Sequence, residues 1–183
     1  MTTNPWLVPI TTLRRSIGNR TREQRAGRVG ELRVGDTHVP SEAEVSADVI
    51  LDSVDGGIEA SATVVAPWAG ECRRCLKPLT GTLHTEVREL YRPRAQGEPP
   101  DQDEETYPLT GEMLDLRPLV RDAILLDLPI APLCREDCAG LCPTCGADLN
   151  EGACDCPPPS GDPRWGALDV LRDPGRTEPG PSA

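Results

Sequence analysis

The spacing of the eight cysteines constrains the fold of this chain more than any other feature of the sequence. They occur as four close pairs, and three of these pairs lie between residues 134 and 156. Thiols at such spacing serve as disulfides, as redox or catalytic groups, or as metal ligands. The pairs are Cys72/Cys75, Cys134/Cys138, Cys142/Cys145 and Cys154/Cys156.

The amino terminus helps to choose among these three uses. It reads MTTNPWLVPITTLRR, without a basic segment followed by an unbroken apolar run and a cleavage site, so we expect a cytoplasmic protein. No apolar run approaches the roughly 20 residues that span a bilayer, so a membrane protein is not expected. Because disulfides are rare in a reducing compartment, clustered CxxC pairs there favour metal.

Zinc is the metal that this pattern indicates, as one or two structural Zn²⁺ ions. A structural site takes four thiolates in a tetrahedron, and a CxxC turn presents two of them. CPTCG and CRRCLKPL have this form, and Gly146 can take the positive φ that follows the second ligand. The short segment GADLNEGA separates two pairs, which predicts a local site of Cys142, Cys145, Cys154 and Cys156.

The remaining four cysteines then form a second site, in which Cys72/Cys75 pairs with Cys134/Cys138. The alternative grouping places Cys134, Cys138, Cys142 and Cys145 around one ion, which leaves Cys72/Cys75 free or paired with Cys154/Cys156. Neighbouring charge differs between the two preferred sites: Arg73, Arg74 and Lys77 flank the first, whereas Asp148, Glu151 and Asp155 flank the local one. We therefore expect the local site to bind its metal more weakly.

Charge is distributed unevenly along the chain. The formal net charge is −11, yet residues 1–33 carry seven arginines against Glu23 and Glu31. This predicts a basic arm at 1–33 that could contact RNA phosphates, and a solvated surface segment is an equally good interpretation. The candidate RNA-binding residues are Arg14, Arg15, Arg20, Arg22, Arg25, Arg28, Arg73, Arg74 and Lys77.

Three β-branched, partly alternating runs follow the basic segment: VSADVILDSV, GIEASATVVAPW and TGTLHTEVRELY. Asp55-Gly56-Gly57 and the first CxxC separate them, which predicts an antiparallel meander or partial barrel. DLRPLVRDAILLDLP has apolar residues at helical spacing, with Asp115 as N-cap and Pro118 in the first turn. The predicted apolar stripe comprises Leu116, Leu119, Val120, Ala123 and Ile124.

These patterns predict an α+β fold with one main helix at about 115–128 and a carboxy-terminal cysteine-rich zinc-binding segment. The expected divisions are the arm 1–33, a β-rich domain 34–133, the zinc-binding segment with a short terminal helix 134–172, and a disordered tail 173–183. Residues 92–106 are rich in proline and acidic residues, which predicts a loop.

Catalysis has little support in the sequence. The only histidines are His38 and His84, each isolated in a strand-like context, and the common nucleotide-binding and hydrolase motifs are absent. A redox CxxC opens a helix, whereas strands flank CRRC. We therefore expect no catalytic residues and no enzyme. A zinc-dependent enzyme or thiol redox sensor acting on RNA or thiols is the alternative.

Three segments together resemble the bacterial YceD family of large ribosomal RNA subunit accumulation proteins. They are ECRRCLKPL, DLRPLVRDAILLDLPIAPLCREDCAGLCPTCGADLN and DPRWGALDVL, within residues 68–172. The resemblance implies a non-enzymatic role in the accumulation, processing or assembly of large-subunit (23S) ribosomal RNA. The partner that the resemblance implies is this rRNA or its precursor. Because a body of this net charge should repel RNA, the alternative partner is a basic large-subunit ribosomal protein bound by the acidic body.

Overall fold

The computed structural model describes residues 4–94, 106–157, 164–165 and 168. The chain forms two compact units, Met1–Cys138 and Ala139–Ala183. Most of the predicted loop 92–106, most of the predicted terminal helix and the whole predicted tail 173–183 lie outside the described residues. Trp165 and Leu168, which lie in the segment of that predicted terminal helix, are both exposed.

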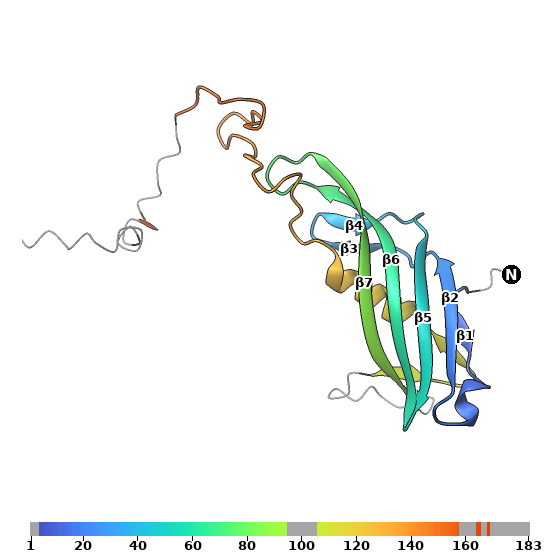
Figure 1. Cartoon of the computed structure of the whole chain (residues 1–183). Helices are drawn as coiled ribbons and strands as arrows, with labels where there is room; N and C mark the ends of the chain where they lie inside the picture. The colour runs from blue at the N-terminus through green and yellow to red at the C-terminus, as the bar shows by residue number, and fades with distance from the viewer. Residues whose placement is uncertain (1–3, 95–105, 158–163, 166–167, 169–183) are drawn as a thin grey trace, which may run out of the picture. The chain divides into compact units, whose positions relative to one another are not determined.

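A mainly antiparallel sheet dominates the first unit (Figure 1). Its order is β2-β5-β6-β4-β3, and β7 pairs with the opposite edge of β6 and, in parallel, with β8. Two further strands, β1 and β9, pair with each other. The bounds are β1 Leu7–Pro9, β2 Arg20–Gly27, β3 Leu32–Val34, β4 Thr37–Val39, β5 Val45–Val54, β6 Gly57–Glu71, β7 Pro78–Pro93, β8 Tyr107–Leu109 and β9 Met113–Asp115.

The three long strands β5, β6 and β7 form the predicted meander. Alternate residues of β5 and β6 are buried, because successive side chains in a strand point to opposite faces. Val54 pairs with Gly57 across a two-residue turn, in which Gly56 has φ +79°. A Cβ on Gly57 would lie 2.2 Å from the Tyr91 carbonyl oxygen, so glycine is required at this position as well.

The segment 1–33 does not stand apart from the sheet, which corrects our expectation of a separate basic arm. Residues 20–27 form β2, which pairs with β5 from Arg20↔Asp52 to Gly27↔Val45. The sequence does not predict this strand, because both of its faces are polar and no apolar alternation marks it. β1 also joins the core, where Trp6 and Val8 are fully buried.

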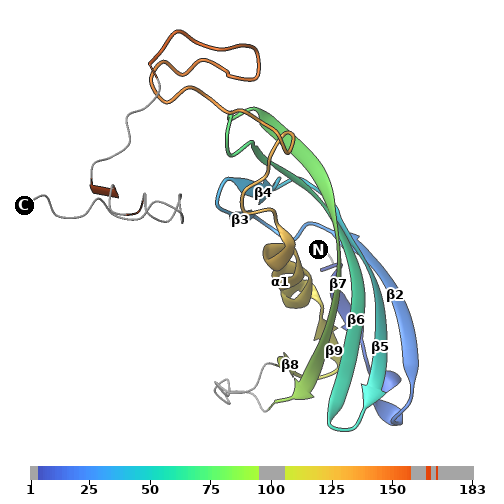
Figure 2. The ribbon, with the colours of Figure 1, turned by 60° about the vertical axis from the view of Figure 1, so that its left-hand side comes forward.

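Helix α1, Arg117–Asp127, lies against the concave face of the curved sheet (Figure 2). Pro118 lies in the first turn, as expected. The N-cap is Leu116, which corrects the expectation of Asp115, although the Asp115 side chain accepts a hydrogen bond from the Arg117 N–H at 2.9 Å. The helix ends before Pro129, as Leu128 leaves helical geometry. All five residues of the predicted stripe, Leu116, Leu119, Val120, Ala123 and Ile124, are buried.

Tertiary contacts of short segments complete the unit. The Trp6 indole donates to the Arg28 carbonyl at 3.1 Å. The Thr37 hydroxyl lies within hydrogen-bond distance of two carbonyl oxygens, those of Val34 and Pro129. A short 3-10 helix, η1 at Leu13–Arg15, precedes β2. In the described part of the chain, no helix has the length and apolarity needed to cross a membrane.

Candidate metal centres

The turn between β6 and β7 is a CxxC knuckle, which we call the first knuckle (residues 72–77). The Cys72 N–H donates to the Lys77 carbonyl at 2.8 Å, and the Leu76 N–H donates to the Cys72 carbonyl at 2.9 Å. Leu76 has φ +59°, a conformation that glycine adopts more readily than leucine. This turn holds Cys72 and Cys75, both buried, at one end of the longest hairpin.

The loop 132–138 brings two more cysteines to this knuckle. The Arg73 N–H donates to the Pro132 carbonyl at 2.9 Å. The Arg74 guanidinium donates to the Cys138 carbonyl at 2.8 Å and to the Glu136 carbonyl at 3.3 Å. Backbone and side-chain contacts therefore fix the loop to the hairpin, independently of the sulfur atoms.

The resulting first cluster consists of Cys72, Cys75, Cys134 and Cys138, whose sulfur atoms all lie within 4.8 Å of one another. The Cys72 and Cys138 sulfurs are 3.8 Å apart, and those of Cys75 and Cys134 are 3.7 Å apart. Four sulfurs at about 2.3 Å from a central Zn²⁺ would be about 3.8 Å apart in a regular tetrahedron. A disulfide needs about 2.0 Å, so the donor set and spacing fit a tetrahedral thiolate site.

A second cluster forms within the second unit from Cys142, Cys145, Cys154 and Cys156. Its knuckle, the second knuckle (residues 142–147), repeats the geometry of the first. The Cys142 N–H donates to the Ala147 carbonyl at 2.8 Å, and the Gly146 N–H donates to the Cys142 carbonyl at 2.9 Å. Gly146 has φ +73°, as the sequence predicts.

Each cluster contains one cysteine whose thiolate is favoured. Burial raises the pKa of Cys72, but backbone N–H groups of Cys75, Cys134 and Arg74 directed at its sulfur outweigh this and lower it to about 6. Backbone N–H groups of Cys145 and Thr144 lower the pKa of Cys142 to about 6. The N–H donor from Cys134 belongs to the loop, so the loop supports the first cluster electrostatically as well.

In each cluster, crowding by a neighbouring sulfur raises the pKa of another cysteine. The neighbouring thiol of Cys138, followed by burial, raises the pKa of Cys134 to about 12, and the thiol of Cys145 does the same for Cys156. Four sulfurs this close cannot all carry a negative charge unless a cation lies among them. The arrangement is therefore suited to hold a soft divalent cation such as Zn²⁺.

The two clusters differ in exposure and in neighbouring charge. Cys72, Cys75 and Cys138 are buried in the first cluster, whereas Cys142 alone is buried in the second. Arg73, Arg74 and Lys77 belong to the first knuckle, but residues 139–157 contain no lysine or arginine. The only charged side chains in that stretch are Asp148, Glu151 and Asp155.

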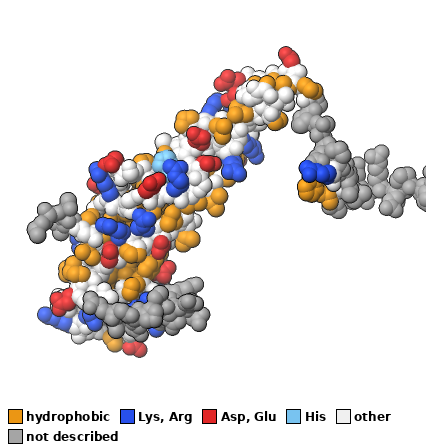
Figure 3. Space-filling view, turned by 180° about the vertical axis from the view of Figure 1, so that it is seen from behind, with side chains coloured by type: hydrophobic (Ala, Val, Ile, Leu, Met, Phe, Trp, Pro, Cys, Tyr) orange, Lys and Arg blue, Asp and Glu red, His pale blue; other side chains and the backbone are white. Residues whose placement is uncertain are grey.

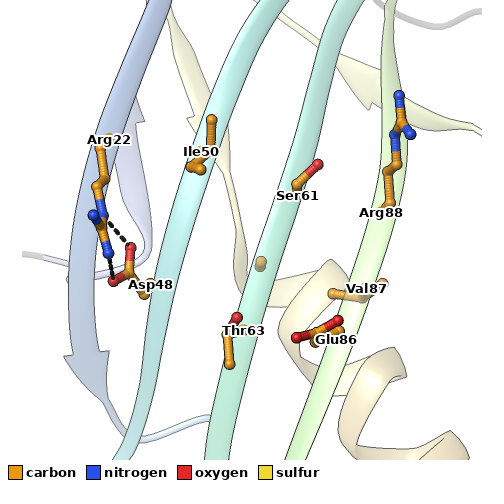
Figure 4. Close-up of a pocket in the computed structure, with 9 residues that line it drawn as sticks. Arg22, Asp48, Ile50, Ser61, Thr63, Glu86, Val87 and Arg88 are labelled. Atoms are coloured by element: carbon orange, nitrogen blue, oxygen red, sulfur yellow. Dashed lines mark hydrogen bonds and ion pairs between the residues drawn. The ribbon is translucent and has the colours of Figure 1, made fainter.

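Most candidate RNA-binding arginines lie beside carboxylates. Arg20 and Arg22 each bind an aspartate of β5 through two hydrogen bonds, Arg20 to Asp52 at 2.6 and 3.0 Å and Arg22 to Asp48 (Figure 4). Figure 4 shows the Arg22–Asp48 pair on the face of the sheet away from α1, which also carries Ser61, Thr63, Glu86 and Arg88 on β6 and β7. The ion pairs raise the pKa of both arginines and lower that of both aspartates.

Other members of the candidate set are also engaged. Arg25 contacts Glu23 and Arg28 contacts Glu42, each at 2.7 Å. Arg14 donates to the Gly111 carbonyl at 2.9 Å, and Arg15 is exposed at the end of η1.

The three candidate RNA-binding residues of the first knuckle have different surroundings. Arg73 lies 3.7 Å from Asp36, Arg74 binds the loop carbonyls, and Lys77 is exposed. Figure 3 shows basic and acidic side chains interspersed over one face of the first unit. The structure therefore does not gather the nine candidates into one basic surface.

Two functional positions lie outside what the sequence patterns identify. Leu76 and Gly146 hold the same place in the two knuckles, so placing CRRCLK over CPTCGA would have marked Leu76 as a positive-φ position. The Arg74 side chain donates hydrogen bonds to backbone carbonyls of a distant loop. The sequence marked Arg74 only as a candidate RNA contact, and no sequence signal indicates its contact with the loop. The two histidines lie in strands, His38 in β4 and His84 in β7, as expected.

Comparison with known proteins finds several relatives of this chain. The chain is 38% identical over 108 residues to an uncharacterized protein of Mycobacterium tuberculosis, covering 58% of this chain and 52% of that one. An uncharacterized protein of Mycobacterium leprae is 32% identical over 108 residues, covering 58% of this chain and 50% of the relative. The chain thus spans about half the length of these curated relatives.

A plant protein carries an informative name. The chloroplastic large ribosomal RNA subunit accumulation protein YCED homolog 1 of Arabidopsis thaliana is 33% identical over 72 residues, covering 39% of this chain and 22% of the relative. No solved structure matches the chain.

The family model of the large ribosomal RNA subunit accumulation protein YceD matches residues 60–172, which include both knuckles and the loop between α1 and the second unit. The chain belongs to the YceD family.

Proposed function

We propose that this protein is a non-enzymatic factor that promotes the accumulation of large-subunit ribosomal RNA and carries two structural zinc ions. Family membership supports the rRNA role, since the family is named for large ribosomal RNA subunit accumulation. The two tetracysteine clusters support the metal content. Zinc in the first cluster would link the end of the β6–β7 hairpin to the loop 132–138.

The partner is a basic protein component of the large-subunit precursor in this proposal. One observation carries this choice: four of the six arginines from 14 to 28 contact carboxylates, at 2.7 Å or less. An arginine paired in this way gains less from a phosphate, because the existing ion pair must first be broken. The formal net charge of −11 also favours a cationic partner.

A pull-down from growing cells separates this proposal from direct rRNA binding. The tagged protein is captured with and without ribonuclease treatment, and the eluate is analysed for large-subunit rRNA and ribosomal proteins. We expect a basic large-subunit protein to remain bound after ribonuclease treatment. Loss of all ribosomal proteins on ribonuclease treatment would instead identify the RNA as the direct partner.

A second experiment tests the arginines themselves. The charge-reversal variant Arg20→Glu/Arg22→Glu/Arg25→Glu/Arg28→Glu is titrated with large-subunit rRNA fragments at several salt concentrations. Phosphate contacts would contribute a log–log salt slope of roughly 0.7 each, so their loss would flatten the slope. We expect the slope of the variant to match that of the wild-type protein. Reversal of Asp48 and Asp52 to lysine in the same variant restores the two ion pairs between β2 and β5 with inverted charges and controls for damage to the sheet.

Zinc content is tested by elemental analysis of protein purified without chelator. Two zinc ions per chain are expected. Less than one zinc per chain, or four disulfides found by mass spectrometry of protein from a reducing cytosol, would contradict the metal part of the proposal. A single zinc together with a fast-reacting thiol would favour an enzyme or redox sensor.

A further inference from the structure

The two knuckles share a backbone and differ in the two residues between their cysteines. Both use the same two hydrogen bonds, from Cys72 to Lys77 and from Leu76 to Cys72 in the first, and between the corresponding residues in the second. By position, Arg73 corresponds to Pro143 and Arg74 to Thr144. At the two positions between the cysteines, the knuckles therefore present chemically different groups from equivalent places on the turn.

In the first knuckle, both inner residues bind the loop that supplies Cys134 and Cys138. The Arg73 N–H donates to the Pro132 carbonyl, and the Arg74 guanidinium donates to the carbonyls of Glu136 and Cys138. The second knuckle cannot make either contact. Proline at 143 has no N–H, and threonine at 144 has one hydroxyl on a short side chain in place of a guanidinium fork.

Zinc alone cannot decide which knuckle receives the loop cysteines. Zn–thiolate bonds are chemically the same whether Cys134 and Cys138 join Cys72/Cys75 or Cys142/Cys145. Loop closure favours the nearer partner: Cys75 and Cys134 are 59 residues apart, whereas Cys138 and Cys142 are close neighbours in the sequence. Groups other than sulfur must therefore select the more distant knuckle.

We propose that the Arg73 N–H and the Arg74 side chain determine how the eight cysteines divide between the two metal sites. Arg74 is a positioning residue, because it holds the Cys134/Cys138 loop without contacting the metal. Pro143 and Thr144 keep the second knuckle from competing for that loop. This inference rests on the zinc sites of the proposed function and adds the residues that specify them.

The test transfers the second knuckle's inner residues to the first, in the variant Arg73→Pro/Arg74→Thr. The same turn already accommodates Pro143-Thr144, so the knuckle backbone tolerates the change. Reduced, metal-free protein is loaded with one or two equivalents of Zn²⁺ and alkylated with N-ethylmaleimide, and mass spectrometry then maps the protected cysteines. Circular dichroism verifies that the sheet is retained.

In the wild-type protein we expect Cys134 and Cys138 to be protected together with Cys72 and Cys75. In the double variant we expect their retention by Cys72/Cys75 to weaken roughly 30-fold, about 2 kcal/mol for the lost hydrogen bonds. Zinc should then protect Cys134 and Cys138 from alkylation together with Cys142 and Cys145.

Two single variants sharpen the test. Arg73→Ala keeps the N–H and should behave as the wild-type protein, whereas Arg74→Lys keeps the charge, loses the fork and should weaken retention in part. A double variant with the wild-type protection pattern would overturn the inference. If Zn²⁺ protects no cysteine in the wild-type protein, the metal sites themselves are wrong.

Discussion

The first and second clusters each present four sulfur atoms, two of them on the same kind of knuckle, but the clusters are assembled in different ways. In the first, Cys75 and Cys134 are 59 residues apart, and the loop is also held by Arg73 and Arg74. In the second, all four cysteines lie between residues 142 and 156. Zinc in the first cluster would therefore cross-link an already folded unit, whereas zinc in the second would order a short segment of its own.

This difference predicts unequal consequences when each knuckle loses its first cysteine. We expect Cys72→Ser and Cys142→Ser each to lower the zinc content from two ions to one. Only Cys72→Ser should lower the unfolding temperature of the sheet, by roughly 10 °C or more, because structural zinc contributes several kcal/mol to the part that it holds together. Unfolding is followed by tryptophan fluorescence, because Trp6 is buried in the sheet unit and Trp68 packs against its core, whereas Trp165 is already exposed. Equal shifts in both variants would contradict the cross-link.

Zinc release should also distinguish the clusters. We expect a chelator to remove zinc from the second cluster at least about tenfold faster, because Asp148, Glu151 and Asp155 add negative charge near its thiolates and most of its cysteines are accessible. The two serine variants, each with one remaining site, assign the fast and slow phases of release. Faster release in Cys142→Ser, which retains only the first cluster, would show that charge and burial do not control lability.

The residue after each knuckle's second cysteine offers a matched pair of substitutions. Gly146→Leu should weaken zinc binding at the second cluster roughly fivefold, because a left-handed backbone costs a non-glycine residue about 1 kcal/mol. A Cβ at Gly146 would meet nothing within 4 Å, so the cost is that of the backbone.

Leu76→Gly should strengthen zinc binding at the first cluster by a smaller factor, since the flexibility that glycine adds to the unfolded chain offsets part of the gain. Competition with a zinc indicator measures both affinities. Two changes in the same direction would mean that the knuckle backbones are not equivalent.

Salt should reduce the difference in zinc-release rate between the two clusters only slightly. Arg73 and Lys77 are exposed, so their attraction for the first cluster's thiolates is screened by ions. Raising NaCl to 1 M should therefore narrow the ratio of the two release rates by a factor of about 2 to 3. The control is Arg73→Ala/Lys77→Ala, whose ratio should start lower and change less with salt.

Local patterns in the sequence were sufficient for the elements that carry the first cluster. The alternating runs predict β5, β6 and β7, Asp55-Gly56 predicts the turn between β5 and β6, and the apolar spacing from Leu116 to Ile124 predicts α1. These predictions succeed because side-chain burial repeats every two residues in a strand and every 3.6 residues in a helix, so apolar residues at that spacing identify the element. The pairing of cysteines by spacing succeeds for the second cluster for the same local reason.

Tertiary structure decided what the residues 1–33 and the arginines do. The strand β2 carries arginine, threonine, glutamate and glutamine on its two faces, so nothing in its pattern distinguishes it from a solvated arm until β5 presents Asp48 and Asp52 in register. The grouping of Cys72/Cys75 with Cys134/Cys138 was one of two arrangements that the spacing allowed. The fold brings the loop 132–138 to the hairpin, and the Arg74 guanidinium meets backbone carbonyls there, a contact between residues 64 positions apart that no local pattern encodes.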